Sequence, residues 1–209
     1  MLDGIKNIIF DFGGVLYNIR YENVPEAFEK FGVPELKNLY SKTSQTDFIN
    51  LFEEGKISAR QFIDEIHKLS PIPLTDKQII DAWNAILVGF PKERANLLKA
   101  LRKNYHLYLF SNTNQLNYDQ FYTEMIKELG YDLFSEMFDG AYFSQNLHIR
   151  KPHPEGFKYI IDKHHLNPSE TLFIDDSPQH IEGAKKCGLR THHLKDNETV
   201  EQLFSFIKY

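Results

Sequence analysis

Short, largely apolar runs alternate with helical periodicity over most of this chain. Strands are expected at 5–10, 106–110, 140–143, 171–174 and 189–193. Helices are expected at 92–103, at 116–129, from 153 onward, at 177–187 and at 197–207. Gly130 and Gly188 follow two of these helices, as C-terminal caps do. This alternation predicts a parallel sheet with helices on both faces.

The segment 21–88 has a different pattern. Apolar residues recur there at helical spacing, for example at Phe62, Ile63 and Ile66, and turn signals such as Glu54-Gly55-Lys56 separate the groups. The pattern predicts four or five helices with no strand between them. Because the segment interrupts the strand–helix alternation directly after the first strand, we expect it to form an inserted cap.

The predicted fold class is therefore α/β, a doubly wound parallel sheet with an inserted α-helical cap. We expect the core to comprise residues 1–16 and 91–209 and the cap to comprise residues 17–90. Ligands of such sheets bind beyond the carboxyl ends of the strands, so that edge is where we look for a site.

Composition narrows the class of protein. The chain has 209 residues, of which 42% are hydrophobic and 25% charged, as is usual for a globular domain. A net charge of −5 without a basic tract argues against nucleic acid as a partner. One cysteine, Cys187, and no recognisable signal segment favour the cytoplasm. No apolar run is long enough to predict a membrane span, and the oligomeric state is left open.

Polar residues with related chemistry follow four of the apolar runs. Asp11 ends the first run and precedes Phe12-Gly13-Gly14; Ser111-Asn112, Lys151-Pro152 and Asp175-Asp176 come later. We expect all four groups at strand ends, and hence at one edge of the sheet.

Together these residues suit phosphoryl transfer. Asp11 can act as a nucleophile that forms an aspartyl-phosphate. Backbone N–H groups of Phe12 and Gly13, the Ser111 hydroxyl and the Asn112 amide can bind phosphoryl oxygens. Lys151 can bridge the phosphate and Asp11. Asp175 and Asp176 offer hard oxygen ligands, for which Mg²⁺ is the expected ion.

Each group alone also has an ordinary structural explanation. Ser111 can make a local hydrogen bond in a turn, Lys151 can be a solvated loop residue, and Asp176-Ser177-Pro178 is a good helix start. The order and combination of the four groups favour a phosphatase acting on a small phosphorylated metabolite.

The motifs IIFDFGGVL, LYLFSNTN, RKPHPEGF and LFIDDSPQHIEGAKKCG resemble the four motifs of the haloacid dehalogenase-like hydrolase superfamily, over nearly the whole chain. The segments LFEEGKIS and NAILVGFP are similar to the branch that contains bacterial α-glucose 1-phosphate phosphatases. The resemblance implies a Rossmann-like core, a small helical cap and a sugar phosphate as substrate.

By resemblance, Asp11 is the nucleophile, and Ser111, Asn112 and Lys151 bind phosphate. The metal would be bound by the Asp11 side chain, the Gly13 carbonyl and Asp176. Asp175 would act as a ligand or as its support, and the cap loop at 54–56 would face the substrate.

The sequence departs from the superfamily pattern at Gly13, where most of its phosphatases carry a second Asp as general acid and base. We expect slow turnover, a preference for good leaving groups, or a substitute acid elsewhere. His180 is a candidate substitute, although a first-turn helix residue that pairs with loop backbone is the simpler interpretation.

Other classes share parts of this residue set. A haloacid dehalogenase also uses an Asp nucleophile without the second Asp, but it needs no metal, which leaves Asp175-Asp176 unexplained. A response-regulator receiver carries its acidic pair first in the chain, not last. A catalytically weakened module that binds a phosphorylated metabolite is favoured by Gly13 alone. An assay of magnesium-dependent phosphate ester hydrolysis would distinguish a phosphatase from such a binding module.

Overall fold

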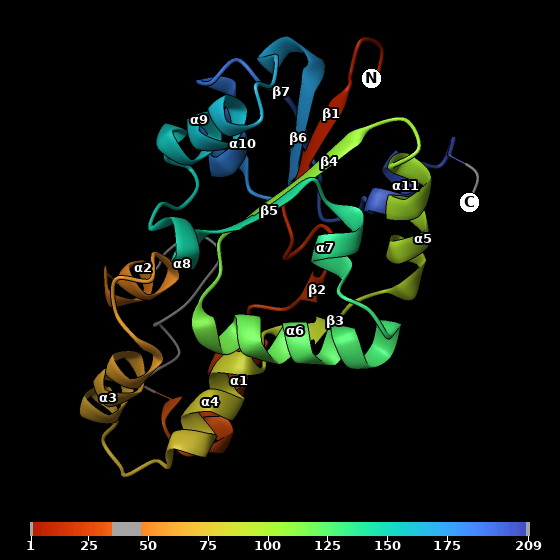
Figure 1. The fold of residues 1–209 in the computed structure, drawn as a ribbon. Helices are drawn as coiled ribbons and strands as arrows, with labels where there is room; N and C mark the ends of the chain where they lie inside the picture. Colours follow the sequence, from red (N-terminus) through yellow and green to blue (C-terminus); the bar gives the residue numbers. More distant parts are fainter. Residues whose placement is uncertain (1, 35–46, 208–209) are drawn as a thin grey trace.

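The computed structural model describes residues 2–34 and 47–207. Its centre is a five-stranded sheet in the order β5-β4-β1-β6-β7, and all paired neighbours are parallel (Figure 1). The strands are β1 (Asn7–Phe10), β4 (His106–Ser111), β5 (Gly140–Phe143), β6 (Thr171–Asp175) and β7 (Arg190–His193). The expected α/β fold with a parallel sheet is thereby confirmed.

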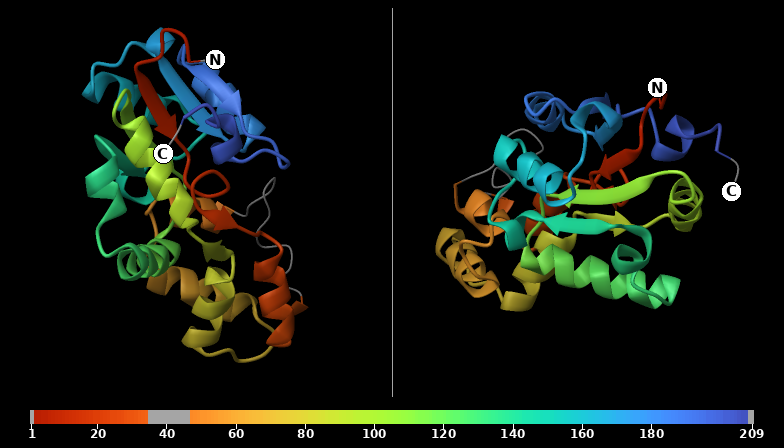
Figure 2. Two further views of the ribbon diagram at one scale, coloured as in Figure 1. Left: turned by 90° about the vertical axis from the view of Figure 1, so that its right-hand side faces the viewer. Right: turned by 45° about the horizontal axis from the view of Figure 1, so that its top comes forward.

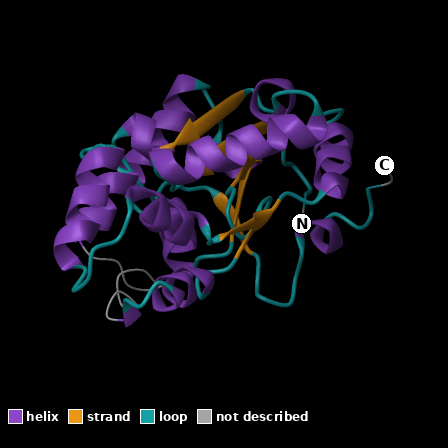
Figure 3. Ribbon diagram, turned by 90° about the horizontal axis from the view of Figure 1, so that it is seen from below, coloured by secondary structure: helices purple, strands orange, loops and turns teal. Residues whose placement is uncertain are grey.

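Helices cover both faces of this sheet (Figures 2 and 3). Successive residues of β1 point to opposite faces, so Ile8 and Phe10 pack in one hydrophobic cluster and Ile9 in another. The first face is covered by α5 (Lys92–Leu101), α6 (Gln115–Leu129), α7 (Leu133–Met137) and α11 (Val200–Leu203). The second face is covered by α9 (Pro154–Lys163) and α10 (Pro178–Lys185).

Local sequence signals explain where several elements end. Gly130 follows α6 with a φ of 78°, a left-handed conformation that favours glycine. In the described part of the chain, three short helical elements were missed in the sequence: α7, α8 (Ser144–Leu147) and a 3₁₀ turn (Pro168–Glu170). The terminal helix α11 is shorter than expected. Elements of three to five residues are too short for a helical period to be read.

The segment after β1 forms a separate helical unit, which we call the helical insert. It consists of α1 (Asn23–Lys30), α2 (Asp47–Glu53), α3 (Ala59–Leu69) and α4 (Asp76–Asn84). These helices pack around their own cluster, which includes Phe28, Phe62 and Trp83. The residues 35–46, which belong to the expected cap, lie outside the described part of the chain. The proposed division into core and cap therefore stays a prediction.

A two-stranded ribbon joins the helical insert to the sheet. Its antiparallel strands are β2 (Asn18–Ile19) and β3 (Leu87–Gly89). The Arg94 guanidinium donates to Asn18 Oδ1 at 3.0 Å and to Glu201 Oε1 at 2.9 Å, which ties the ribbon to α5 and α11. Sequence analysis missed the ribbon because such short strands have no readable alternation. None of the described helices combines the length and apolar composition needed to cross a bilayer.

Candidate active site

Asp11 lies directly after β1, at the carboxyl edge of the sheet. Its backbone N–H continues the pairing of β1 with β6 by donating to the Ile174 carbonyl at 2.9 Å. Its Oδ1 accepts a hydrogen bond from the Phe12 N–H at 2.7 Å and lies 2.7 Å from Lys151 Nζ. The side chain is therefore held by the strand behind it and by two donors.

Lys151 lies beside Asp11 as expected, but a different part of the structure positions it there. It does not end a strand, because α8 and a turn separate it from β5. Instead the Asn112 side chain holds its backbone: Asn112 Nδ2 donates to the Lys151 carbonyl at 3.0 Å, and the Lys151 N–H donates to Asn112 Oδ1 at 2.9 Å. The peptide bond from Lys151 to Pro152 is cis. The prediction that a strand places Lys151 was wrong, although the residue reaches the expected place.

Asp175, at the end of β6, is bound on both carboxylate oxygens. Its Oδ2 lies 2.7 Å from Lys151 Nζ, and its Oδ1 accepts from the Ser177 N–H at 2.8 Å. His180 Nδ1 lies 3.0 Å from each oxygen. His180 thus pairs with a carboxylate rather than with the loop backbone expected from the sequence. We call Asp11, Lys151 and Asp175 the floor group.

Within the floor group, Lys151 is completely buried, with an exposed fraction of 0%. Burial would lower the pKa of Lys151, but the charges of Asp11 and Asp175 outweigh it and raise the pKa. Burial raises the pKa of Asp11 well above its ordinary value, with Asp175 adding to the shift and Lys151 opposing it. Burial would also raise the pKa of Asp175, but Lys151 and His180 hold it below its usual range. One lysine therefore fails to neutralise the carboxylates around it.

Asp176 lies against the glycine turn that follows Asp11. A Cβ atom added at Gly14 would stand 2.6 Å from Asp176 Oδ2, and Gly14 has a φ of 82°. Only glycine therefore allows this carboxylate to approach the turn so closely. At Gly13 the nearest atom to an added Cβ would be Ile19 Cδ1 at 3.2 Å, so this position has more room.

A cavity of about 200 Å³ opens above the floor group. Of the site residues predicted from the sequence, those that line it are Asp11, Phe12, Gly13, Ser111, Asn112, Lys151 and Asp176. Asp175 lies behind Lys151 and is fully buried. The cavity is smaller than the pockets that take drug-sized ligands, and it suits a small metabolite.

The helical insert contributes residues to the same cavity that sequence analysis missed. Asn50 and Glu53 of α2 line it together with Arg150, the neighbour of Lys151. Arg150 Nη1 donates to Asn50 Oδ1 at 2.6 Å, and Arg150 Nη2 lies 2.7 Å from Glu53 Oε2. We call these three residues the roof group. Arg150 stood inside the motif RKPHPEGF, and Glu53 directly precedes the loop that was expected to face the substrate.

The loop 54–56 itself is placed differently from that expectation. Glu54 pairs with Lys56 at 2.7 Å, and neither residue lines the cavity. Gly55 instead packs on α8, where a Cβ atom would stand 2.2 Å from the Gln145 carbonyl oxygen. The loop therefore docks the helical insert against the sheet domain, and the preceding turn of α2 faces the cavity.

The donor set of the site fits a hard divalent cation. Among the described residues, Asp11, Asp175 and His180 carry ligand atoms within 4.8 Å of one another, and Asp176 lines the same cavity as Asp11. Because Asp175 and His180 are bonded to each other, Asp11 and Asp176 are the carboxylates of this set that a cation in the cavity can reach. The raised pKa of Asp11 reflects burial and carboxylate charge beyond what Lys151 offsets. Mg²⁺ prefers one or two carboxylates with phosphate and water, which matches the oxygen atoms available here.

Comparison with known proteins identifies the family of this chain. The family model described as haloacid dehalogenase-like hydrolase matches residues 5–188. A D-ribitol-5-phosphate phosphatase from Bacteroides thetaiotaomicron is 35% identical to this chain, and the alignment covers 97% of this chain and 98% of the relative.

Solved structures give the same result. A wild-type HAD family enzyme from Bacteroides thetaiotaomicron, in complex with magnesium and inorganic phosphate, superposes with a TM-score of 0.82, 33% identity, and coverage of 96% of this chain and 99% of that one. An HAD-like family hydrolase from Porphyromonas gingivalis gives a TM-score of 0.84 at 29% identity, covering 97% of both chains. This chain belongs to the haloacid dehalogenase-like hydrolase family.

Proposed function

We propose that the protein hydrolyses the phosphate monoester of a small polyhydroxylated metabolite through an aspartyl-phosphate on Asp11. It is a magnesium-dependent phosphatase of the haloacid dehalogenase-like family that acts on a small phosphate ester. The observation that carries the proposed mechanism is the contact of 2.7 Å between Asp11 Oδ1 and the buried Lys151 ammonium at the floor of the cavity.

In this mechanism Asp11 attacks with Oδ2, because Phe12 and Lys151 both bind Oδ1. The new bond joins Oδ2 to phosphorus, the bond from phosphorus to the ester oxygen breaks, and the leaving alkoxide takes a proton from solvent water. Water then attacks the phosphorus of the acyl phosphate, releasing inorganic phosphate and restoring the Asp11 carboxylate. Lys151 stays charged throughout and holds the nucleophile in line with the phosphoryl group.

The phosphoryl oxygens would be bound by groups that already face the cavity. The Ser111 hydroxyl, the Lys151 ammonium and the Gly13 N–H are the proposed donors, whereas the Phe12 N–H already donates to Asp11 Oδ1. The Asn112 side chain is occupied in holding Lys151, so we assign Asn112 to phosphate binding through its backbone.

Asp11, the Gly13 carbonyl and Asp176 are the residues that would hold Mg²⁺. When bound, the ion neutralises charge on the phosphoryl oxygens. Asp175 supports this set from behind, since its two oxygens already serve Lys151, Ser177 and His180. The related enzyme from Bacteroides thetaiotaomicron, which contains magnesium and phosphate, supports the choice of ion.

The relative that acts on D-ribitol 5-phosphate supports an acyclic polyol phosphate as the substrate. An α-glucose 1-phosphate type of substrate, suggested by the motifs LFEEGKIS and NAILVGFP, is the second candidate. Gly13 favours that second candidate, because an anomeric oxygen is a good leaving group that needs less help from an acid.

The same proposal assigns residues 1–16 and 91–209 to the catalytic core and residues 17–90 to a cap over it. It places the protein in the cytoplasm, since Cys187 is the one cysteine of the chain and allows no internal disulfide.

Two alternative functions explain fewer of the site residues. If the protein were a dehalogenase, Asp176 would have no role; if it only bound a ligand, the Asp11–Lys151 contact would have none.

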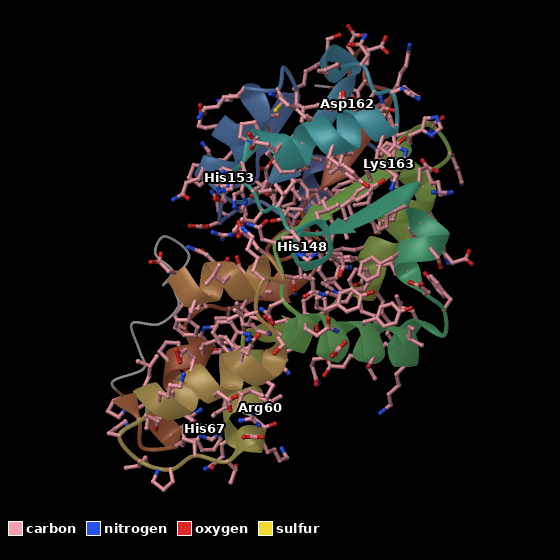
Figure 4. All side chains as sticks on the ribbon, turned by 60° about the vertical axis from the view of Figure 1, so that its left-hand side comes forward. Arg60, His67, His148, His153, Asp162 and Lys163 are labelled. Carbon is pink, nitrogen blue, oxygen red and sulfur yellow. The ribbon has the colours of Figure 1, made fainter. Side chains whose placement is uncertain are left out.

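The test measures the release of inorganic phosphate from phenyl phosphate and from D-ribitol 5-phosphate in the presence of Mg²⁺. We expect Asp11→Asn to lower kcat at least about 10³-fold, because the nucleophile is lost. Asp162→Asn, an exposed change on α9 (Figure 4), is the matched control. Full activity of Asp11→Asn, or of the wild type in excess chelator, would refute the proposal.

A further inference from the structure

The roof group connects two parts of the chain that lie far apart in the sequence. Arg150 bridges Asn50 and Glu53 of α2 at 2.6 and 2.7 Å, although 100 positions separate Arg150 from Asn50. The Glu53 side chain is 3% exposed and the Arg150 side chain 17%. The pair is thus a nearly buried ion pair in the wall of the cavity that Asp11 and Lys151 also line.

Further contacts hold the roof group in place. The Ser144 hydroxyl donates to the Glu53 carbonyl at 2.6 Å, and His148 Nδ1 lies 2.8 Å from the Glu54 carbonyl oxygen. Figure 4 shows His148 where α2 meets the sheet domain, whereas Arg60 and His67 lie at the far end of the helical insert. With Gly55 packed on Gln145, α2 is fixed close to the cavity and is preorganised for a ligand.

The roof group is electrically neutral and rich in hydrogen-bonding atoms. The Glu53 carboxylate accepts, the Arg150 guanidinium donates, and the Asn50 amide does both. Hydroxyl groups can satisfy all three without disturbing the ion pair. A second anionic group on the ligand would compete with Glu53 for Arg150, and it would be repelled by the nearby, nearly buried Glu53 carboxylate.

We propose that Glu53, Arg150 and Asn50 determine substrate specificity: they select a neutral polyhydroxylated leaving group and reject esters whose leaving group carries a carboxylate. This inference rests on the proposed phosphatase function and adds the residues that choose the substrate.

The test compares kcat/KM for D-ribitol 5-phosphate with kcat/KM for phosphoglycolate, in Mg²⁺, for each variant. Glu53→Gln keeps the shape of the side chain and removes the negative charge that competes with a ligand carboxylate for Arg150. We expect the ratio of the two values to fall at least about tenfold, mainly through a lower KM for phosphoglycolate, which corresponds to a shift of about 1.4 kcal/mol. Glu54→Gln is the matched control, since Glu54 pairs with exposed Lys56 outside the cavity.

Two further outcomes complete the test. If Glu53→Gln does not fold, as judged by thermal unfolding, Asn50→Leu replaces it, and a fall of about fivefold in kcat/KM for the polyol phosphate supports the inference. An unchanged ratio in a folded Glu53→Gln variant, or an unchanged polyol phosphate value in Asn50→Leu, overturns it. If the wild type hydrolyses neither these esters nor phenyl phosphate, the proposed function fails as well; hydrolysis without a preference for the polyol overturns this inference alone.

Discussion

The floor group and the roof group of the cavity are built in contrasting ways. Asp11 follows β1 and Asp175 ends β6, and the pairing of these two neighbouring strands brings the carboxylates together. Asn50 and Glu53 face Arg150 only because a separately packed helical insert docks on the sheet domain. The floor carries more carboxylates than its one lysine neutralises, whereas the roof is a balanced ion pair.

This contrast separates two tasks. The unbalanced charge of the floor suits a cation and a phosphoryl group, whose chemistry is the same for every ester. The balanced roof suits contacts with the variable part of the substrate. Changes in the floor should therefore affect all substrates alike, and changes in the roof should alter the choice among them.

The largest effect is expected from Lys151→Met in the floor group. Removing the ammonium leaves two buried carboxylates without their shared partner, which should lower the free energy of unfolding by about 3–5 kcal/mol. Urea denaturation measures the loss. Lys163→Met, at an exposed position of α9, is the control and should cost little. An equal loss in the two variants would contradict the assigned role of Lys151.

Gly13→Asp tests the glycine turn beside the floor group, against which Ile19 of the ribbon packs. Its backbone is outside the left-handed region, and the 3.2 Å contact with Ile19 requires only a small shift. A carboxyl group there would supply the missing general acid and should raise kcat for esters of poor leaving groups about 10²-fold. Gly13→Asn has nearly the same size without the acid. No gain over Gly13→Asn would show that proton transfer does not limit the reaction.

A smaller effect is expected from Gly55→Ala, which tests how the roof is held. Gly55 has a φ of 63°, and a Cβ atom would stand 2.2 Å from the Gln145 carbonyl oxygen. We expect a loss of about 2 kcal/mol in stability and a higher KM for the polyol phosphate. Gly130→Ala is matched in conformation, with a φ of 78°, but a Cβ atom there meets nothing within 4 Å. It should cost about 1 kcal/mol without changing KM; identical behaviour of the two variants would show that the contact with Gln145 does not matter.

Much of the fold follows from local sequence patterns. The short apolar runs and the glycine after α6 predicted the strands and a helix end, because strand burial and the left-handed cap are properties of a few adjacent residues. Asp11 and Ser111 were found for the same reason, since each ends or directly follows a strand of a parallel sheet.

The sequence by itself thus determined the parallel sheet, the family motifs and the residue types of the floor group. Tertiary structure decided how Lys151 arrives there, because the Asn112 side chain, rather than a strand, holds its backbone. Tertiary structure also decided that Glu53, and not the loop 54–56, faces the cavity. Such contacts join residues about 40 to 100 positions apart and depend on how two hydrophobic clusters dock, which no local period records.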